Sequence, residues 1–366
     1  MLQFRPTELS GDTELHIKSR KNFITSIPRL LQIFNVNVKN VRGETALMVA
    51  AQHNAAGTIE KLITYGADVN ATDDLGNTAL HSATYHCSAR ITILLCDFQA
   101  NVNIQNIHGK TPVHLAAQAN MCDILNYLTR HSTTNVNYSL VDNEGYTPFL
   151  SAVRKGNVRV VRNFIRSGYA CEELDVEGRN ALHLACSLES TALLRQFPYS
   201  NLHDQRDTMG HTPLSTAVRH GNEAAVDYLL QTGSSTLTRD FNGNTILHIV
   251  CLGYNLVLLQ RLFSLSIFTD KEPRNDLQET PLHLVCREGK LLAFEALLPL
   301  RPSFNARDTQ GRTPLILAIQ FQHNELATAL LQVNSPTAFL VDTNTADVVG
   351  NTPVSPRATP VSPNFF

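Results

Sequence analysis

The sequence predicts an all-α repeat solenoid, in which helix-turn-helix pairs joined by β-hairpin turns stack along the chain. Three observations predict it. A Gly-x-Thr-[Ala/Pro]-Leu motif recurs from Gly43 to Gly311 at spacings of 32 to 36 residues. An Asp or Asn stands three residues before the first position of each of these copies. Two short apolar stretches with helical spacing follow the motif.

Nine copies of the motif are clear. They begin at Gly43, Gly76, Gly109, Gly145, Gly178, Gly210, Gly243, Gln278 and Gly311. A degenerate first copy begins at Gly11, and a truncated last copy begins at Gly350. The copy at Gly178 is short in its second half, where Glu189 replaces the usual glycine, so we expect a distorted helix pair there.

Each copy predicts the same local structure. The Asp or Asn suits a turn that hydrogen-bonds its own backbone, and the glycine suits a left-handed turn conformation. The threonine is a helix N-cap, and proline often follows it at the first helical position. A first helix such as "TPVHLAAQA" (111–119) and a second such as "AAVDYLLQTG" (224–233) complete the repeat.

The motif resembles the D-x-x-G-x-T-P-L-H-x-A-A signature of ankyrin repeats. The resemblance implies an ankyrin-repeat stack over residues 11–334. Residues 1–10 would be an N-terminal lead-in, and residues 335–366 a terminal hairpin remnant followed by a proline-rich, disordered tail with two copies of "TPVSP".

The stretch "GNTALHSATYHC" (76–87) holds two histidines and a cysteine, which raises the question of a metal or catalytic cluster. His81, however, has counterparts at the same motif position in other copies. These are His16, His114, His183, His248 and His283. In ankyrin repeats this histidine ties neighbouring turns together by hydrogen bonds, so the resemblance implies a scaffold role. We therefore predict no catalytic residue, no metal site and no cofactor.

The composition limits the function classes. Hydrophobic residues make up 43% of the chain and charged residues 17%, and the net charge is −2, so nothing points to nucleic acid or a membrane surface. The seven cysteines form no C-x-x-C pair, which is typical of reduced thiols. No apolar signal-peptide core and no membrane-spanning stretch is evident. We expect a monomeric protein of the cytoplasm or nucleus that is not an enzyme.

A partner is expected at positions that the repeat itself does not need. These are the hairpin tips beside the glycine and the exposed end of the first helix. Aromatic and basic residues at these positions would anchor an acidic or phosphorylated protein segment. The candidates are Tyr85, His86, Tyr146, Arg154, Lys155, His211, Arg219, His220, Phe241, Arg287 and Phe321. A solvated face without a partner is the alternative interpretation of the basic residues.

Modification sites are a second group of candidates. Ser355, Thr359 and Ser362 each precede proline, as proline-directed kinase sites do. Asn70 and Asn103 end segments that resemble ankyrin sequences hydroxylated by asparaginyl hydroxylases.

The sequence thus predicts a non-enzymatic intracellular scaffold that binds a partner protein through the concave face of the solenoid. Three narrower classes remain open: an inhibitor-of-NF-κB-like transcription-factor regulator, a ubiquitin-ligase substrate adaptor, and a microbial effector directed at a host.

Overall fold

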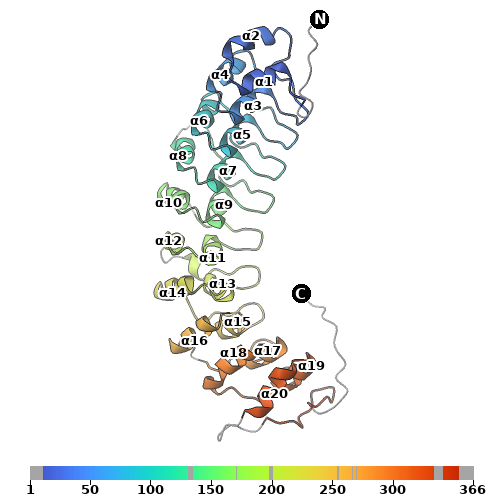
Figure 1. Cartoon of the computed structure of the whole chain (residues 1–366). Coiled ribbons are helices and arrows are strands. Elements are labelled where there is room, and N and C mark those ends of the chain that lie inside the picture. Colours follow the sequence, from blue (N-terminus) through green and yellow to red (C-terminus); the bar gives the residue numbers. More distant parts are fainter. Residues whose placement is uncertain are drawn as a thin grey trace. The chain divides into compact units, whose positions relative to one another are not determined.

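The computed structural model describes residues 11–130, 135–169, 171–197, 201–253, 255–265, 267–268, 270–333 and 341–353, without the side chains of residues 129 and 130. The chain divides into two compact units, an N-terminal unit (Met1–Ala185) and a C-terminal unit (Cys186–Phe366). In both, repeats of a turn, an inner helix and an outer helix follow one another (Figure 1). The predicted all-α ankyrin-repeat architecture is confirmed.

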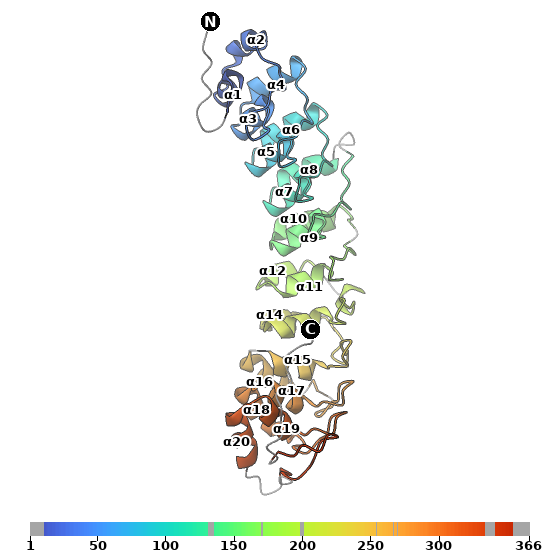
Figure 2. The ribbon, with the colours of Figure 1, turned by 90° about the vertical axis from the view of Figure 1, so that its right-hand side faces the viewer.

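The N-terminal unit has two layers of helices. The inner layer consists of α1 (Glu14–Arg20), α3 (Ala46–Gln52), α5 (Ala79–Tyr85), α7 (Pro112–Gln118), α9 (Pro148–Arg154) and α11 (Ala181–Cys186), whose last residue falls in the next unit. The outer layer consists of η1 (Ile24–Ser26), α2 (Ile27–Leu30), α4 (Ala56–Thr64), α6 (Ala89–Asp97), α8 (Cys122–Arg130) and α10 (Val158–Arg166). From α1 to α9 each inner helix packs against the next one, and from α2 to α10 each outer helix does the same (Figure 2).

The C-terminal unit repeats this arrangement. Its inner helices are α13 (Pro213–His220), α15 (Ile246–Leu252), α17 (Pro281–Arg287) and α19 (Pro314–Gln320). Its outer elements are α12 (Thr191–Leu194), η2 (Asn201–His203), α14 (Glu223–Gln231), α16 (Leu256–Ser264), α18 (Leu291–Leu297), η3 (Leu298–Leu300) and α20 (Asn324–Gln332). The four-residue α12 belongs to the short repeat at Gly178, whose predicted distortion is thereby confirmed.

The inner helices begin where the motif predicts. Threonine is the N-cap of α3, α5, α7, α9, α13 and α19, and its side chain accepts the N–H of the third helical residue. The turn before it is closed by the Asp or Asn. Asp73 Oδ1, for example, accepts the N–H groups of Leu75 and Asn77, at 2.9 and 2.7 Å. These hairpins project from the inner helices, away from the outer layer (Figure 1).

Where the recurring histidine is present, it links its repeat to the next one. In α5 the backbone N–H of Thr78 donates to His81 Nδ1 at 3.1 Å, so this nitrogen is unprotonated and the proton sits on Nε2. Nε2 then donates to the carbonyl of Lys110 in the following repeat, at 3.0 Å. Equivalent links run from His16 to Glu44, His114 to Tyr146, His248 to Glu279 and His283 to Arg312, at 2.9 to 3.1 Å. The histidines are scaffold residues.

A second set of links joins the start of an outer helix to the end of the inner helix of the preceding repeat. Asn157 Nδ2 donates to the carbonyls of Ala117 and Gln118, at 2.8 and 2.9 Å. Asn255 Nδ2 donates likewise to the Gly221 carbonyl at 3.0 Å. These bonds satisfy carbonyls that a helix end leaves without an intrahelical partner.

The histidine links predict a loss of stability in mild acid. Burial lowers the pKa of His81 and His248 from 6.5 to about 4, and it lowers the pKa of His16, His114 and His283 as well. The unfolded chain therefore binds more protons than the folded chain between about pH 6.5 and 4. The free energy of unfolding should fall as the pH drops through this window, which urea unfolding at a series of pH values would measure.

A substitution separates this effect from general acid denaturation. His248→Leu should lower the free energy of unfolding by about 1–3 kcal/mol at pH 7, because the Glu279 carbonyl loses its donor, and the pH dependence should become shallower. His108→Gln, at an exposed side chain, is the matched control and should change neither. An unchanged slope in His248→Leu would contradict the assignment.

Candidate partner-binding surface

The predicted partner-binding residues lie on two rows in each unit, the hairpin tips and the C-terminal ends of the inner helices (Figure 1). The ends of the inner helices carry Tyr85, His86, Arg154 and Lys155 in the N-terminal unit. They carry Arg219, His220, Arg287 and Phe321 in the C-terminal unit. Tyr146 lies just after the hairpin glycine of its repeat, as does His211, and Phe241 lies at a hairpin tip.

Tyr85 is the most exposed aromatic residue on these rows. Its side chain is 73% exposed, at the last position of α5. The ring of His86 meets it edge-on, with centroids 5.4 Å apart, and His86 Nδ1 is bonded to the Ser82 carbonyl at 2.9 Å. At the end of the next inner helix stands Ala119, which is exposed and too small to cover a neighbour. A ligand group can therefore reach the tyrosine ring.

Tyr146 is not the exposed anchor that the sequence predicts, so that expectation is wrong for this residue. It is only 6% exposed, and the Arg154 guanidinium lies over its ring, 4.7 Å from the centroid. Arg179 donates to its hydroxyl at 3.1 Å. Burial raises the pKa of the phenol above its usual value, against the opposing effect of the two arginines. Tyr146 thus supports two arginines of the surface rather than contacting solvent.

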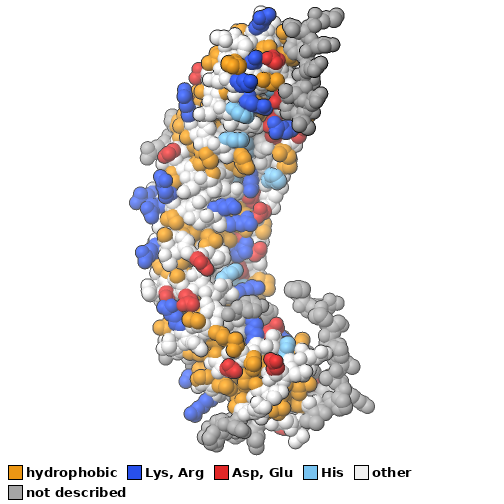
Figure 3. All heavy atoms as spheres, viewed as in Figure 1, with side chains coloured by type: hydrophobic (Ala, Val, Ile, Leu, Met, Phe, Trp, Pro, Cys, Tyr) orange, Lys and Arg blue, Asp and Glu red, His pale blue; other side chains and the backbone are white. Residues whose placement is uncertain are grey.

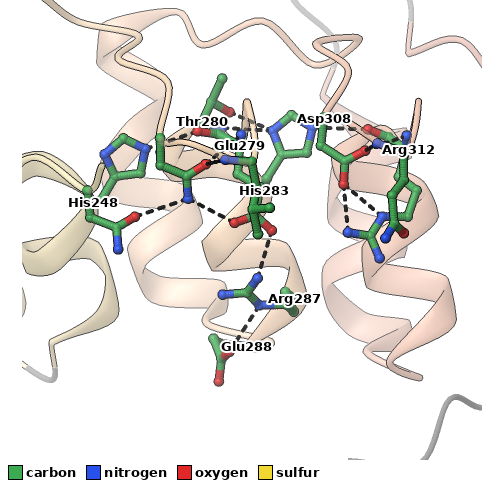
Figure 4. A network of polar contacts seen from close by, with 12 residues as sticks. His248, Glu279, Thr280, His283, Arg287, Glu288, Asp308 and Arg312 are labelled. Atoms are coloured by element: carbon green, nitrogen blue, oxygen red, sulfur yellow. Dashed lines mark hydrogen bonds and ion pairs between the residues drawn. The ribbon is translucent and has the colours of Figure 1, made fainter. Parts of the chain in front are cut away.

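Most of the predicted arginines are already ion-paired. Arg287 Nη1 lies 2.7 Å from Oε1 of the buried Glu279, and its Nε lies 3.4 Å from Glu288 (Figure 4). Glu279 in turn accepts from Asn275 at 2.9 Å. Arg154 pairs with Glu144. Along this side of the molecule, acidic side chains lie beside several of the basic ones (Figure 3).

The pair of Glu279 with Arg287 is one example of a spacing that the sequence analysis missed. The residue after the hairpin glycine contacts the residue eight positions later, at the end of its own inner helix. The pairs are Glu44 with Gln52 (2.7 Å), Lys110 with Gln118 (3.4 Å), Tyr146 with Arg154 (4.7 Å to the ring centroid) and Glu279 with Arg287 (2.7 Å). The sequence contains a signal for these contacts, because the side chains at the two motif positions are chemically complementary in each pair.

Two of the predicted basic residues have no carboxylate partner, in the part of the chain that the structure describes, to compensate their charge. Among the described residues, neither Lys155 nor Arg219 has a carboxylate within ion-pair distance, and both side chains are exposed. His220 is exposed as well, beside Arg219. His211 is not available in this way, because it is 91% covered: its Nδ1 lies 3.4 Å from Asp207 and its Nε2 3.8 Å from Asp240. The expectation that His211 is an open basic tip is wrong.

The remaining aromatic candidates are open to solvent. Phe241 is 61% exposed at its hairpin tip, and Phe321, the C-cap residue after α19, is also exposed. They belong to different repeats of the C-terminal unit. With Arg219 and His220 they give this unit both apolar and basic groups on the predicted rows.

Two of the five modification candidates, Asn70 and Asn103, lie among the described residues. The side-chain oxygens of Asn70 and Asn103 accept the backbone N–H groups of Asn101 and Asn137, both at 2.8 Å, so these two asparagines join adjacent repeats. Ser355, Thr359 and Ser362 lie outside the described residues.

Within the described ranges, no group of three or more His, Cys, Asp or Glu side chains is arranged to hold a metal ion. Burial raises the pKa of the thiols of Cys96 and Cys171, the first to about 12 and the second to about 11, which makes them poor nucleophiles. In the same part of the chain, no helix combines the length and the hydropathy that crossing a membrane requires.

Comparison with known families gives the same class of protein as the fold. A model of three ankyrin repeats matches residues 15–106, 52–140 and 253–344, and a single-repeat model matches residues 209–241. Together these matches cover more than half of the chain, which therefore belongs to the ankyrin-repeat family. Ankyrin repeats generally mediate protein–protein interaction, and their fold is typically a non-enzymatic binding scaffold.

Similar individual proteins have diverse roles. Palmitoyltransferase AKR1 of Lachancea kluyveri is 27% identical over 201 residues, which are 51% of this chain and 27% of that protein. The probable 26S proteasome regulatory subunit p28 of Saccharomyces cerevisiae is 29% identical over 46% of this chain and 76% of its own length. Rabankyrin-5 of Mus musculus is 28% identical over 42% of this chain and 14% of its own length. The chain spans about a quarter of the first of these relatives.

The ion pairs predict that two surface arginines differ in their effect on stability. Arg287→Ala should lower the free energy of unfolding by about 1–3 kcal/mol, because it leaves the buried Glu279 carboxylate without its cation. Arg219→Ala, at the matching end of α13, should change it by less than about 0.5 kcal/mol. Urea unfolding at pH 7 measures both, and equal effects would contradict the structural role of Arg287.

Proposed function

We propose that this chain is a non-enzymatic, intracellular interaction module that binds a segment of a partner protein through its hairpin tips and inner-helix ends. The observation that carries the proposal is the placement of exposed aromatic side chains and uncompensated basic ones on these rows. Tyr85 and Lys155 provide them in the N-terminal unit, and Arg219, Phe241 and Phe321 in the C-terminal unit. Exposed aromatic residues and arginines are the side chains that most often dominate binding energy.

The chemistry of these rows favours an acidic or phosphorylated segment. Lys155 and Arg219 have no carboxylate partner among the described residues, so an incoming carboxylate or phosphate meets a free cation. Arg154 keeps one guanidinium edge on Glu144 and its face on Tyr146, which fixes its position beside Lys155. A held cation loses less side-chain entropy on binding than a mobile one.

The relatives support the interaction role and no narrower activity. A palmitoyltransferase, a probable proteasome regulatory subunit and Rabankyrin-5 share this repeat region with the chain although their names describe different functions. What the matched regions have in common is the repeat stack itself. A scaffold role therefore accounts for the similarity without transfer of any one relative's activity.

A pull-down from cell extract with quantitative mass spectrometry tests the proposal. The variant Tyr85→Ala/Lys155→Ala/Arg219→Ala/Phe321→Ala should recover a specific partner at least about tenfold less than the unchanged chain, because it removes both anchors and charges. The matched control, Arg159→Ala/Arg166→Ala/Leu292→Ala, changes exposed side chains of the outer helices and should leave recovery unchanged.

Circular dichroism must show the same helix content for all three chains. The fourfold variant is called the inner-row variant, and its control the outer-helix control. If the outer-helix control loses the partner and the inner-row variant keeps it, the partner binds the outer layer and the proposal is wrong.

A further inference from the structure

The C-terminal unit carries a basic feature that the sequence analysis did not single out. In four consecutive repeats an arginine stands directly before the Asp or Asn that closes the hairpin turn. These residues, here called the arginine column, are Arg206, Arg239, Arg274 and Arg307. All four are exposed, and within the described part of the chain none has a carboxylate within ion-pair distance.

Two of these arginines are positioned by backbone carbonyls. Arg239 Nη1 donates to the carbonyls of Gly243 and Arg274, at 2.8 and 2.7 Å. Arg274 Nη1 donates to those of Gln278 and Arg307, at 3.3 and 2.9 Å. Each guanidinium therefore reaches the next repeat along the column. Because a carbonyl is neutral, these bonds hold the guanidinium groups in place without cancelling their charge.

The acidic residues nearby leave a net positive charge on the column. Asp240 and Asp308 alternate with the arginines along the extended segment, so they point the other way, and their buried carboxylates accept N–H groups of their own turns. Asp204 and Glu272, two residues before an arginine, each accept a backbone N–H of the next repeat, at 3.2 and 2.9 Å. Asp276, two residues after Arg274 at a hairpin tip, is exposed as well, so four guanidinium groups stand beside three carboxylates.

Three exposed apolar side chains lie on the same hairpins. Met209, Phe241 and Leu277, here called the apolar tip row, are 53%, 61% and 52% exposed in consecutive repeats. The tips are joined, since the Phe241 N–H donates to the Met209 carbonyl at 3.1 Å. Phe241 also covers Gly210, where an added Cβ would lie 2.9 Å from its Cγ. This contact accounts for one side of the ring and leaves the rest in solvent.

The hydrogen bonds fix the spacing of the row. Each hairpin contributes two passes of backbone: Asp240 N–H donates to Asn244 within one hairpin, and Asp276 N–H donates to Asn242 of the preceding hairpin, both at 3.0 Å. Paired backbone segments lie about 4.8 Å apart, so equivalent tip positions repeat at about 10 Å. Met209 and Leu277 hold the equivalent position two repeats apart, whereas Phe241 stands one position earlier in its turn, beside Met209. Seven residues of an α-helix rise about 10.5 Å and return to nearly the same face.

Other backbone conformations fit this spacing less well. An extended strand covers about 10 Å in three residues, which turns the third side chain to the opposite face. A polyproline II helix keeps its register, but such ligands dock in aromatic-lined grooves, whereas the tip row contains one aromatic residue. Aliphatic and methionine side chains are typical of surfaces that bind an apolar helix face.

We propose that the hairpin face of the C-terminal unit binds an amphipathic α-helix with apolar residues at seven-residue spacing and acidic residues along one flank. Arg239 and Phe241 are two residues apart, one before and one after the Asp240 that closes the turn, so their backbones lie within about 7 Å of each other. A helix 10–12 Å wide covers both the apolar tip row and the arginine column. The inference rests on the interaction role proposed above and names the class of partner.

The N-terminal unit has the apolar tips but lacks the arginine column. Its tips Val41, Leu75 and Ile107 are also apolar and exposed in consecutive repeats. The residues before the turn are Lys39, Thr72 and Gln105 there, so the column of four arginines has no counterpart. Charge complementarity therefore assigns the acidic helix to the C-terminal unit.

The test uses the full chain and fluorescein-labelled peptides of three heptads, held helical by a hydrocarbon staple on the side opposite the leucines. One peptide has leucine at every seventh position and glutamate along one flank. A second has lysine in place of glutamate, and a third has the same composition with the leucines out of register. Fluorescence anisotropy should show the glutamate peptide binding at least about tenfold more tightly than either of the others.

Substitutions in the chain locate the site. Phe241→Asp and Arg239→Gln/Arg274→Gln should each weaken binding of the glutamate peptide at least about tenfold, while Arg239→Lys/Arg274→Lys keeps most of it because the charge remains. Two exposed residues of the outer helices are the matched controls. Leu292→Asp (side chain 60% exposed) and Arg261→Gln should change the affinity less than about twofold.

Several results would overturn the inference: no binding of the glutamate peptide by the unchanged chain, equal binding of the glutamate and lysine peptides, equal losses in the controls, or tighter binding of a single-stranded DNA oligonucleotide. If these occur while the inner-row variant still loses its partner from extract, the interaction role stands and the helix proposal alone fails. If neither Phe241→Asp nor the inner-row variant loses a partner, both fail.

Discussion

The structure depends on a neutral histidine held between two repeats. Its Nδ1 accepts a backbone N–H from the N-cap of its own helix, and its Nε2–H donates to a carbonyl of the next repeat, as at His81 and His248. The same ring therefore starts a helix and joins two hairpins. A single repeat cannot bury its apolar faces alone, so local structure and stacking have to form together. One buried imidazole per link couples them.

Some repeats lack this residue, and their links differ. Met48, Leu150, Ser215 and Ile316 occupy the histidine position in α3, α9, α13 and α19, and the Ser215 hydroxyl turns back to the Thr212 carbonyl of its own cap. Where α15 follows α13, Asn255 at the start of α16 bonds the Gly221 carbonyl at the end of α13. Separate inter-repeat hydrogen bonds thus occur in the hairpin layer, at the helix ends and in the connectors. Together they stabilise the packing of each repeat on the next.

The sequence predicts the fold because each of its signals is local and repeated. Thr78, for example, caps α5, and Asp73 closes the turn before it, from residues within five positions of each other. The exposure of Tyr146 and the pairing of Arg287 depend on contacts between a turn and the far end of a helix, eight residues away. A motif that treats each position separately cannot show them, although the chemical match of Glu279 with Arg287 could be read once that contact is known.

The two kinds of arginine in the C-terminal unit show how a scaffold contact affects recognition. Arg287 forms an ion pair with the carboxylate of Glu279, so its charge is compensated within the protein. Arg239 makes hydrogen bonds as short as those of Arg287, but its acceptors are carbonyls and its charge remains. An ordered side chain is therefore not a sign that a residue is unavailable to a partner. What decides availability is the charge of the acceptor, because a neutral acceptor positions the cation in advance and leaves the electrostatic attraction for the ligand.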